Sequence, residues 1–481
     1  MRRARLERLR QTGIDPYPAR VLRTHSAAAF LHAHATLLKD QTPVTVVGRI
    51  RTLRKHGGLT FLHIEDGSSH LQLVIKKDAF SADAYTFFHE TVDVGDFLEV
   101  TGTAFTTQKG ELSLSVQRAH IIAKSILPLP EKWHGLSDVE TRYRKRYLDL
   151  LANESVRATF RIRAEIISAI RRELMDQGYL EVETPILQAV PGGASAKPFK
   201  TYHNALQADM YLRVAPELYL KRLLVGGFER VFEVARCFRN EGIDHAHNPE
   251  FTQIEGYAAY MDFNELMGLM EHIMLAAIRA AGRDPSAVPF RGHVLNFTPP
   301  WPRLTFKDAV LAHARLDIEA HTDREQLAKA AIKLGVPVEK SASHGSLLDA
   351  IYKHTVRPAI IQPTYIYQYP AEITPLSKRV PEDSRYIEMF QLVYGSGEEN
   401  IKAFSELNDP LDQEARFREQ DAARARGDEE AQFSDDDYVE AMKHGMPPNA
   451  GFGIGIDRLT ALLTDAPNLK EVILFPTLRP E

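Results

Sequence analysis

Short runs of alternating apolar and polar residues fill the chain between residues 44 and 119. Alternation of this kind is typical of β-strands that bury one face, because successive side chains point to opposite sides of a strand. Glycine-containing steps between the runs supply turns. Five strands are predicted, at residues 44–50, 59–65, 70–75, 97–104 and 111–119. Five short strands within roughly eighty residues predict a small barrel of the oligonucleotide-binding (OB) type.

A barrel of this type binds single-stranded nucleic acid by stacking bases on aromatic rings and by hydrogen-bonding base edges. Phe61, within the second predicted strand, is the candidate stacking platform. The alternative is that Phe61 packs inside the barrel, and an aromatic residue in a strand is at least as often buried for packing.

The pattern changes beyond residue 130, where Leu-Pro-Leu-Pro ends the strand-rich part. Residues 156–175 carry apolar side chains at helical spacing, and Gly178 follows where a helix C-terminus favours glycine. We therefore predict three parts: a helical lead-in at 1–40, the barrel domain at 41–130 and a larger domain at 131–481. Residues 303–360 are predicted to be a helical insertion in the larger domain.

A hairpin is predicted around residues 231–260, because two strand-like runs flank a loop rich in turn residues. In its second strand Phe251, Gln253, Glu255 and Tyr257 share one face. Arg239 ends the first strand and offers a planar fork for a carboxylate or phosphate. A face that is aromatic and acidic together, beside an arginine, predicts a binding site. A surface hairpin with an ion pair is the alternative.

Glycine also marks the last strand of the chain, in the stretch GFGIGIDRL at residues 451–459. Three alternate glycines leave one strand face bare, against which a flat ring can lie, and Arg458 falls in the first turn of the next predicted helix. A dinucleotide fingerprint is the rival interpretation, but the spacing differs from G-x-G-x-x-G and no acidic partner follows.

The composition of the chain indicates which partners and which cellular compartment suit the protein. The net charge is −5, but residues 1–60 hold twelve basic and three acidic side chains, a local balance of +9 that leaves −14 for the remainder. A basic end on an acidic body suits a local RNA contact, although a solvated helix face explains residues 1–10 equally well. The single cysteine excludes an intrachain disulfide. We expect a cytoplasmic protein without a membrane span, since no apolar run reaches membrane length.

Several motifs resemble one family. FRNEG at residues 238–242 and HNPEFT at 247–252 resemble motif 2 of class II aminoacyl-tRNA synthetases, and specifically of the bacterial lysyl type. The helix and proline at 156–185 resemble motif 1, GFGIGIDRL resembles motif 3, and GIDPYP at 13–18 matches the lead-in of that family. The resemblance implies an α+β fold: an antiparallel sheet flanked by helices, preceded by a five-stranded OB barrel, in a homodimer.

The resemblance also implies an activity and its site residues. Lysine would be activated with ATP and Mg²⁺ to lysyl-adenylate and transferred to tRNA(Lys). The implied catalytic residues are Arg239 and Arg458. The implied ATP-binding residues are Arg239, Glu241, His247, Phe251, Glu399 and Arg458. The implied lysine-binding residues are Gly193, Glu217, Arg239, Glu255, Tyr257 and Glu406. The implied metal positions are Glu399, Glu406 and Gln391, and the implied anticodon contacts are Arg54, Phe61, Gln72 and Glu111. A catalytically silent or repurposed relative that binds RNA or modifies a protein is the alternative.

The chain departs from the family pattern in one stretch. Counting back from Phe404 places Glu399 on a metal glutamate and Lys402 on an asparagine, while Gln391 replaces the other metal glutamate. A one-residue insertion would instead give these roles to Glu398 and Asn400. In both registers an amide replaces a carboxylate, and we expect weaker metal binding there.

Overall fold

A computed structural model describes residues 1–130, 136–244, 247–339, 342–425 and 432–480. The chain divides into two compact units, Met1–Gly135 and Leu136–Glu481. Within the described residues no helix is long and apolar enough to cross a membrane.

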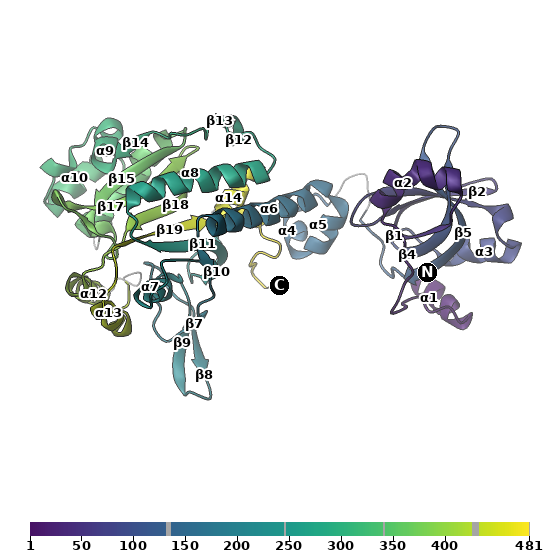
Figure 1. The fold of residues 1–481 in the computed structure, drawn as a ribbon, viewed down its shortest axis with the longest axis horizontal. Helices are drawn as coiled ribbons and strands as arrows, with labels where there is room; N and C mark the ends of the chain where they lie inside the picture. Colours follow the sequence, from purple (N-terminus) through teal and green to yellow (C-terminus); the bar gives the residue numbers. More distant parts are fainter. Residues whose placement is uncertain (131–135, 245–246, 340–341, 426–431, 481) are drawn as a thin grey trace. The chain divides into compact units, whose positions relative to one another are not determined.

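The first unit is built on a closed barrel with the strand order β1-β2-β3-β5-β4 (Figure 1). Its strands are β1 (Val44–His56), β2 (Leu59–Glu65), β3 (His70–Lys76), β4 (Phe97–Thr106) and β5 (Leu112–Ala123). Each coincides with a predicted strand, which confirms the OB barrel, although β1 and β5 run several residues further. Helix α3 (Ala82–Thr91), between β3 and β4, was not predicted.

The lead-in helices α1 (Arg2–Gln11) and α2 (Ala27–Asp40) pack on this barrel and belong to its unit. Leu9 and Phe30 are buried in the same hydrophobic core as the barrel strands. Residues 1–40 are therefore part of the barrel domain, because the short helices bury their apolar faces only against it.

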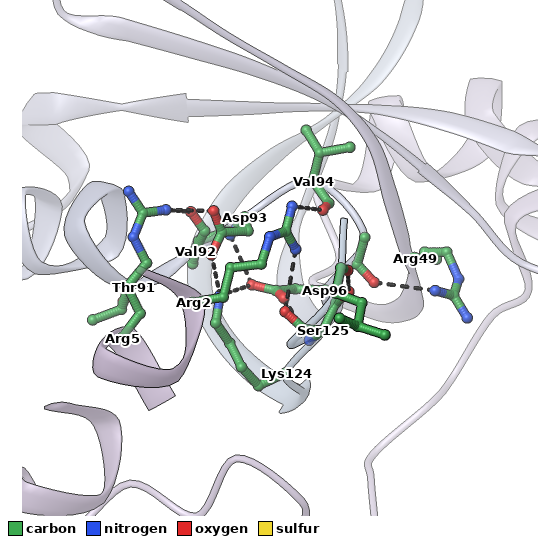
Figure 2. A network of polar contacts seen from close by, with 12 residues as sticks. Arg2, Arg5, Arg49, Thr91, Val92, Asp93, Val94, Asp96, Lys124 and Ser125 are labelled. Carbon is green, nitrogen blue, oxygen red and sulfur yellow. Dashed lines mark hydrogen bonds and ion pairs between the residues drawn. The ribbon is translucent and has the colours of Figure 1, made fainter. Parts of the chain in front are cut away.

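Polar contacts also fasten α1 to the barrel (Figure 2). The Arg2 guanidinium donates to the carbonyl of Val94 at 2.9 Å. Arg5 forms an ion pair with Asp93. Behind them the buried ammonium of Lys124 lies between Asp93 and Asp96, at 2.6 and 2.7 Å. Part of the basic charge of the N-terminal end is thus used within the domain.

The second unit contains a nine-stranded sheet with the order β14-β15-β17-β18-β19-β11-β10-β6, and β16 pairs with β17. The strands are β6 (Leu180–Glu181), β10 (Arg230–Phe238), β11 (Glu250–Ala259), β14 (Arg303–Thr305), β15 (Thr364–Pro370), β16 (Arg379–Val380), β17 (Asp383–Tyr394), β18 (Glu398–Ser405) and β19 (Asn449–Gly455). The predicted antiparallel sheet is confirmed for its central strands, whereas the outer pairs β14–β15 and β10–β6 are parallel.

One face of this sheet is covered by α6 (Glu154–Asp176) and α8 (Phe263–Ala280), as Figure 1 shows. Both helices are amphipathic, and their apolar stripes share one core with Ile254, Ile401 and Phe452 of the central strands. Because side chains alternate across a strand, the residues between these core positions face the opposite side of the sheet. That opposite face carries the site.

Smaller elements surround the sheet. They are α4 (Val139–Arg144), α5 (Arg146–Ala152), β7 (Leu187–Gln188), β8 (Lys200–His203), β9 (Ala208–Leu212), α7 (Glu217–Val225), β12 (Val288–Phe290), β13 (His293–Leu295), α12 (Pro410–Ala425), α13 (Asp436–Lys443) and α14 (Ile456–Thr464). The predicted insertion contains α9 (Phe306–Ala314), α10 (Arg324–Lys333) and α11 (His344–Ile351). It begins later than predicted, since residues 303–305 form strand β14 of the main sheet.

Candidate active site

A cavity of about 480 Å³ lies over the face of the sheet that the helices α6 and α8 leave uncovered. Segments far apart in the sequence line it together. Among the residues predicted for the site, the lining includes Gly193, Glu217, Arg239, Glu241, His247, Phe251, Glu255, Tyr257, Gln391, Glu399 and Arg458. Glu406 lies behind this lining, within reach of Gly451 and Lys221.

The β11 face forms the floor, as the alternation of its residues predicted. Glu255 is buried and accepts hydrogen bonds from Gln253 at 2.5 Å and from the Tyr257 hydroxyl at 3.2 Å. Burial, reinforced by the negative charge of Glu217, raises the pKa of Glu255 to about 8. Glu255 is therefore mostly protonated at neutral pH before a substrate binds, although Arg239 and Lys221 favour its charged form.

The neighbouring strand β19 keeps its cavity face bare because three glycines alternate there. At Gly451 the requirement is steric: a Cβ atom would lie 2.2 Å from the Tyr257 ring and 2.5 Å from a carboxylate oxygen of Glu406. At Gly453 a Cβ atom would meet Glu255 only at 3.7 Å, an ordinary contact. Gly451 thus makes room for the acidic end of the cavity.

We expect Gly451→Ala to destabilise the fold by about 1–3 kcal/mol, because buried neighbours must shift to admit the methyl group. Gly453→Ala is the matched control on the same strand face and should stay within about 0.5 kcal/mol of the wild type. Urea denaturation of the three proteins measures both values. Equal losses in the two variants would contradict the steric role of Gly451.

The acidic end holds a lysine of the chain itself, which sequence reasoning missed. Lys221 of α7 is fully buried, and its ammonium contacts Glu217 at 2.5 Å and forms an ion pair with Glu406. The rings of Tyr257 and Phe404 lie 5.7 and 5.5 Å from the same nitrogen. Burial lowers the pKa of Lys221, but the two carboxylates more than offset this and raise it above its usual value.

The i, i+4 spacing of Glu217 and Lys221 was the available sequence signal, yet such pairs are common on exposed helix faces. Only the tertiary structure reveals that this one is buried. Gly193 lies against the same helix start, with φ of +89° and room for no Cβ, since that atom would be 2.8 Å from Glu217. The residues predicted for one end of the substrate are thus brought together, with Lys221 among them.

The opposite end of the cavity carries the cationic groups. The Arg239 guanidinium lies 5.0 Å from the centroid of the Phe251 ring, and its Nε is buried without a hydrogen-bond partner among the described residues. Arg458 is the third residue of α14 and donates to the Glu399 carbonyl at 2.9 Å. Its guanidinium is 3.5 Å from His247, whose other ring nitrogen lies 2.9 Å from Asp244. This end suits the phosphates and the flat base of a nucleotide.

Strand β18 contains the residues of both registers that the sequence left open. A β-bulge lies between the pairs Leu392–Ile401 and Val393–Glu399, and it accommodates Asn400. The Asn400 amide lies in the core, 3.9 Å from the sulfur of Met274. Glu399, Asn400 and Lys402 all contribute to the lining of the cavity. Glu398 forms an ion pair with Arg291 and is not among the lining residues, which favours the register with Glu399 and Lys402 at the site.

The three predicted metal positions do not form one site. Glu406 contacts Lys221 at the acidic end, while Glu399 lies seven residues earlier, about 20 Å away along an extended chain. Glu406 is therefore not a partner of Glu399 in metal binding. Within the described residues no three Asp, Glu, His or Cys side chains cluster as a metal site. Glu399 alone fits one magnesium ion, which commonly takes one carboxylate together with substrate phosphates.

The helical insertion borders the cavity, a role that the sequence did not reveal. Asp349 and Lys353, at the end of α11 and just after it, line the cavity. Arg357, which follows, lies 3.5 Å from the Glu399 carboxylate. The insertion thus positions a carboxylate at the cationic end.

The barrel has a cavity of its own, lined by Phe61, Gln72 and Glu111. Phe61 is half-buried on the outer face of β2, whereas its neighbours Leu62 and Ile64 are in the barrel core. Packing inside the barrel is thus excluded for Phe61. Arg54 pairs with Phe61 across β1 and β2 and is exposed. The Gln72 amide donates to Ser113 at 2.8 Å, and Glu111 lies 3.0 Å from His63.

Comparison with known proteins agrees with both domains. Residues 138–479 match the family of class II tRNA synthetases (D, K and N), and residues 44–122 match the OB-fold nucleic acid binding domain. A lysine–tRNA ligase of Roseiflexus sp. (strain RS-1) is 48% identical over 481 residues, which cover 100% of this chain and 98% of that protein. Lysine–tRNA ligases of Pelotomaculum thermopropionicum and Chloroflexus aurantiacus are each 46% identical, over 100% and 99% of this chain and 94% and 97% of theirs. With an OB barrel, and with a sheet whose cavity is lined by the expected motifs, the chain belongs to the class II tRNA synthetase family of the D, K and N type.

Proposed function

We propose that the protein is a lysine–tRNA ligase that activates L-lysine with ATP and transfers it to tRNA(Lys). The observation that carries the proposal is the acidic end of the cavity, where Glu255 and Tyr257 line the wall and Glu406 lies directly behind it, beside Gly451. A cationic side chain is stabilised among buried carboxylates, whereas the anionic side chain of aspartate would be repelled there.

The test is ATP–pyrophosphate exchange measured with each amino acid in turn. Lysine should stimulate exchange, and aspartate and asparagine should not. Exchange that depends on aspartate, or no exchange with any amino acid, would contradict the proposal. The second outcome is the one that a catalytically silent relative predicts.

The reaction needs no protein nucleophile. The lysine carboxylate attacks the α-phosphate of ATP in line, a P–O bond forms, and pyrophosphate leaves with the electron pair of the broken bond. A terminal ribose hydroxyl of the tRNA then attacks the carbonyl carbon, loses its proton and displaces AMP. Catalysis rests on positioning and charge stabilisation.

The arrangement of the cavity supports a role for each group. We assign Arg239 to the lysine carboxylate and the α-phosphate, because it lines the cavity and its buried Nε has no hydrogen-bond partner among the described residues. Phe251 would stack under adenine. Glu241 and His247 would hold the nucleotide, and Arg458 the outer phosphates. Gly193 and Glu217 would bind the α-amino group, and Glu255, Tyr257 and Glu406 the ε-ammonium group.

Magnesium is the ion that we propose for Glu399, where it would neutralise charge on the nucleotide phosphates. Arg357, at 3.5 Å, keeps the Glu399 side chain oriented toward the cavity. The carboxylate is the group of this chain that would receive the ion.

Lysine affinity should rise with pH between 6 and 8. The pKa of Glu255 is about 8, so the protonated, neutral form prevails below that value, and lysine must displace the proton to gain a carboxylate partner. One proton released per lysine bound predicts a Kd that falls about tenfold per pH unit and levels off above pH 8. Titration calorimetry in two buffers of different ionisation enthalpy measures both the Kd and the proton. Glu255→Gln is the control and should bind weakly at all these pH values; a constant wild-type Kd would contradict the role of Glu255.

Phe61→Ala should weaken tRNA charging about 10- to 100-fold while ATP–pyrophosphate exchange is unchanged, because stacking of one base contributes about 1–3 kcal/mol. Phe61 lies on the barrel surface and faces its cavity, which leaves the ring accessible to RNA. The two assays on one preparation measure the separation. Parallel loss of both activities in a folded variant would contradict anticodon binding at this position.

We further propose a homodimer formed near the motif 1 segment. The edge strand β6 is exposed, and Met175, Leu180, Ile186 and Leu187 are apolar side chains of this segment that remain exposed. Apolar side chains along an unpaired sheet edge favour association with a second copy. Sedimentation velocity measures the oligomeric state, and a monomer at micromolar concentration would contradict the proposal. We also propose a cytoplasmic location, because tRNA and ATP are both available there.

A further inference from the structure

Lys402 and Gln391 lie opposite each other on neighbouring strands of the cavity floor. They are directly paired across β18 and β17, and both line the cavity. On the other side of Lys402, Gly453 and then Glu255 continue the same row across β19 and β11. The pair therefore lies between the acidic end, with Glu255 and Glu406, and the phosphate end, with Glu399.

Gln391 is oriented by two buried tyrosines. The Tyr369 hydroxyl donates to its amide oxygen at 2.8 Å, and Tyr369 in turn lies 2.9 Å from the Tyr352 hydroxyl. Tyr352 can donate to Tyr369 and Tyr369 to Gln391, so one continuous chain satisfies all three groups. The amide oxygen is thus used internally, and the amide NH₂ remains as the polar group for the cavity.

Lys402 brings a positive charge to this point. Among the described residues its ammonium forms no ion pair, and it lies 6.0 Å from the centroid of the Phe404 ring. Lys221, by contrast, is held by two carboxylates at the acidic end. An ammonium without a carboxylate partner, inside a ligand cavity, attracts an anion.

The Lys402 ammonium and the Gln391 amide NH₂ offer positive charge and hydrogen-bond donors, whereas a magnesium site needs oxygen ligands. Magnesium requires oxygen ligands and is repelled by an adjacent ammonium. The donor set at Gln391 and Lys402 therefore does not fit a metal ion, whereas Glu399, on the same two strands, does.

We propose that Lys402, supported by the Gln391 amide, binds an oxyanion of the substrates where amino acid and nucleotide meet, and that its ammonium supplies there the positive charge that a second metal ion would otherwise provide. The proposal rests on the proposed activation of lysine by ATP. Two groups carry such an oxygen at this junction, namely the carboxylate of the amino acid and the α-phosphate of ATP. Lys402 then contacts the reacting groups and acts in the first step by stabilising negative charge.

Binding measurements on single variants test whether Lys402 binds an oxyanion of a substrate. Lys402→Met should raise the Kd of the ligand that owns the oxyanion about 10- to 100-fold, as expected for loss of a charged hydrogen bond. Lys402→Arg retains the charge and should stay within a few-fold. Lysine and ATP are titrated separately, with EDTA present for ATP, so the ligand affected identifies the carboxylate or the phosphate. Lys333→Met makes the same change on the exposed surface of α10 and should have no effect.

A count of bound metal ions tests whether the Lys402 ammonium takes the place of a second metal ion. This test does not depend on enzyme activity. Mn²⁺ binding is followed by electron paramagnetic resonance with a non-hydrolysable ATP analogue. The double variant Gln391→Glu/Lys402→Met restores a carboxylate and removes the ammonium, and should bind one more Mn²⁺ per chain than the wild type. The single variant Gln391→Glu should not, because its carboxylate pairs with Lys402.

The outcomes separate this proposal from the proposed function. Kd values for lysine and ATP that both stay within twofold in Lys402→Met would overturn the oxyanion site. An equal Mn²⁺ count in the wild type and the double variant would overturn the replacement of a metal ion by Lys402. Wild-type protein that fails to exchange pyrophosphate with lysine would instead overturn the function itself.

Discussion

Arg239→Ala is expected to reduce lysine-dependent ATP–pyrophosphate exchange about a thousandfold. Its guanidinium is the group best placed to hold the lysine carboxylate and the α-phosphate together, and its buried Nε lacks a hydrogen-bond partner among the described residues. Loss of a preorganised donor to a transition-state oxyanion costs about 10²–10³ in rate, and arginines at transferring phosphates contribute more. Steady-state exchange and single-turnover adenylate formation measure the loss.

Arg236→Ala is the matched control for this experiment. Arg236 lies three residues earlier on the same hairpin, but its side chain is exposed and pairs with Glu250 at 3.2 Å. We expect that variant to retain wild-type exchange. Arg239→Lys tests geometry, because a lysine keeps the charge but cannot bind two oxygens through a planar fork. Nearly full exchange by Arg239→Ala would exclude Arg239 from the reaction.

Lys221→Met is expected to abolish lysine-dependent exchange and to destabilise the fold by about 3–5 kcal/mol. The substitution nearly preserves side-chain volume but leaves Glu217 and Glu406 buried without their common cation. Removing one partner of a buried ion pair has an effect of about this size, because the remaining charge is uncompensated. Urea denaturation and lysine titration measure the two effects separately.

The double variant Lys221→Met/Glu406→Gln distinguishes charge balance from lysine recognition. Removing one charge of each sign restores the balance, so much of the lost stability should return. Lysine binding should not return, because Glu406 is then absent from the acidic end. Full recovery of lysine affinity in the double variant would show that Glu406 does not bind the substrate, whereas unchanged stability in Lys221→Met would contradict a coupled buried pair.

The sequence alone determined the elements and the composition of the site. Alternation at residues 44–119 predicted all five barrel strands, because each buries one face in the barrel and exposes the other. The same logic predicted that Gln253, Glu255 and Tyr257 share a face of β11, and that three glycines leave a face of β19 bare. These features depend on the alternation of side chains along a strand, which can be read from the order of the residues alone.

Only the tertiary structure determined the features that depend on the distance between segments or on burial. The ion pair of Glu217 and Lys221 has the spacing of a surface pair, and only the packing of α7 against β18 and β11 makes it a buried charge centre. The bulge at Asn400 could not be predicted, since either neighbouring register satisfies the alternation and only the pairing of β17 with β18 shows which residue is extra. Glu399 and Glu406 were grouped by type, but an extended strand separates them. Local patterns fix faces and turns, whereas the partner of a charged group is fixed only when distant segments meet.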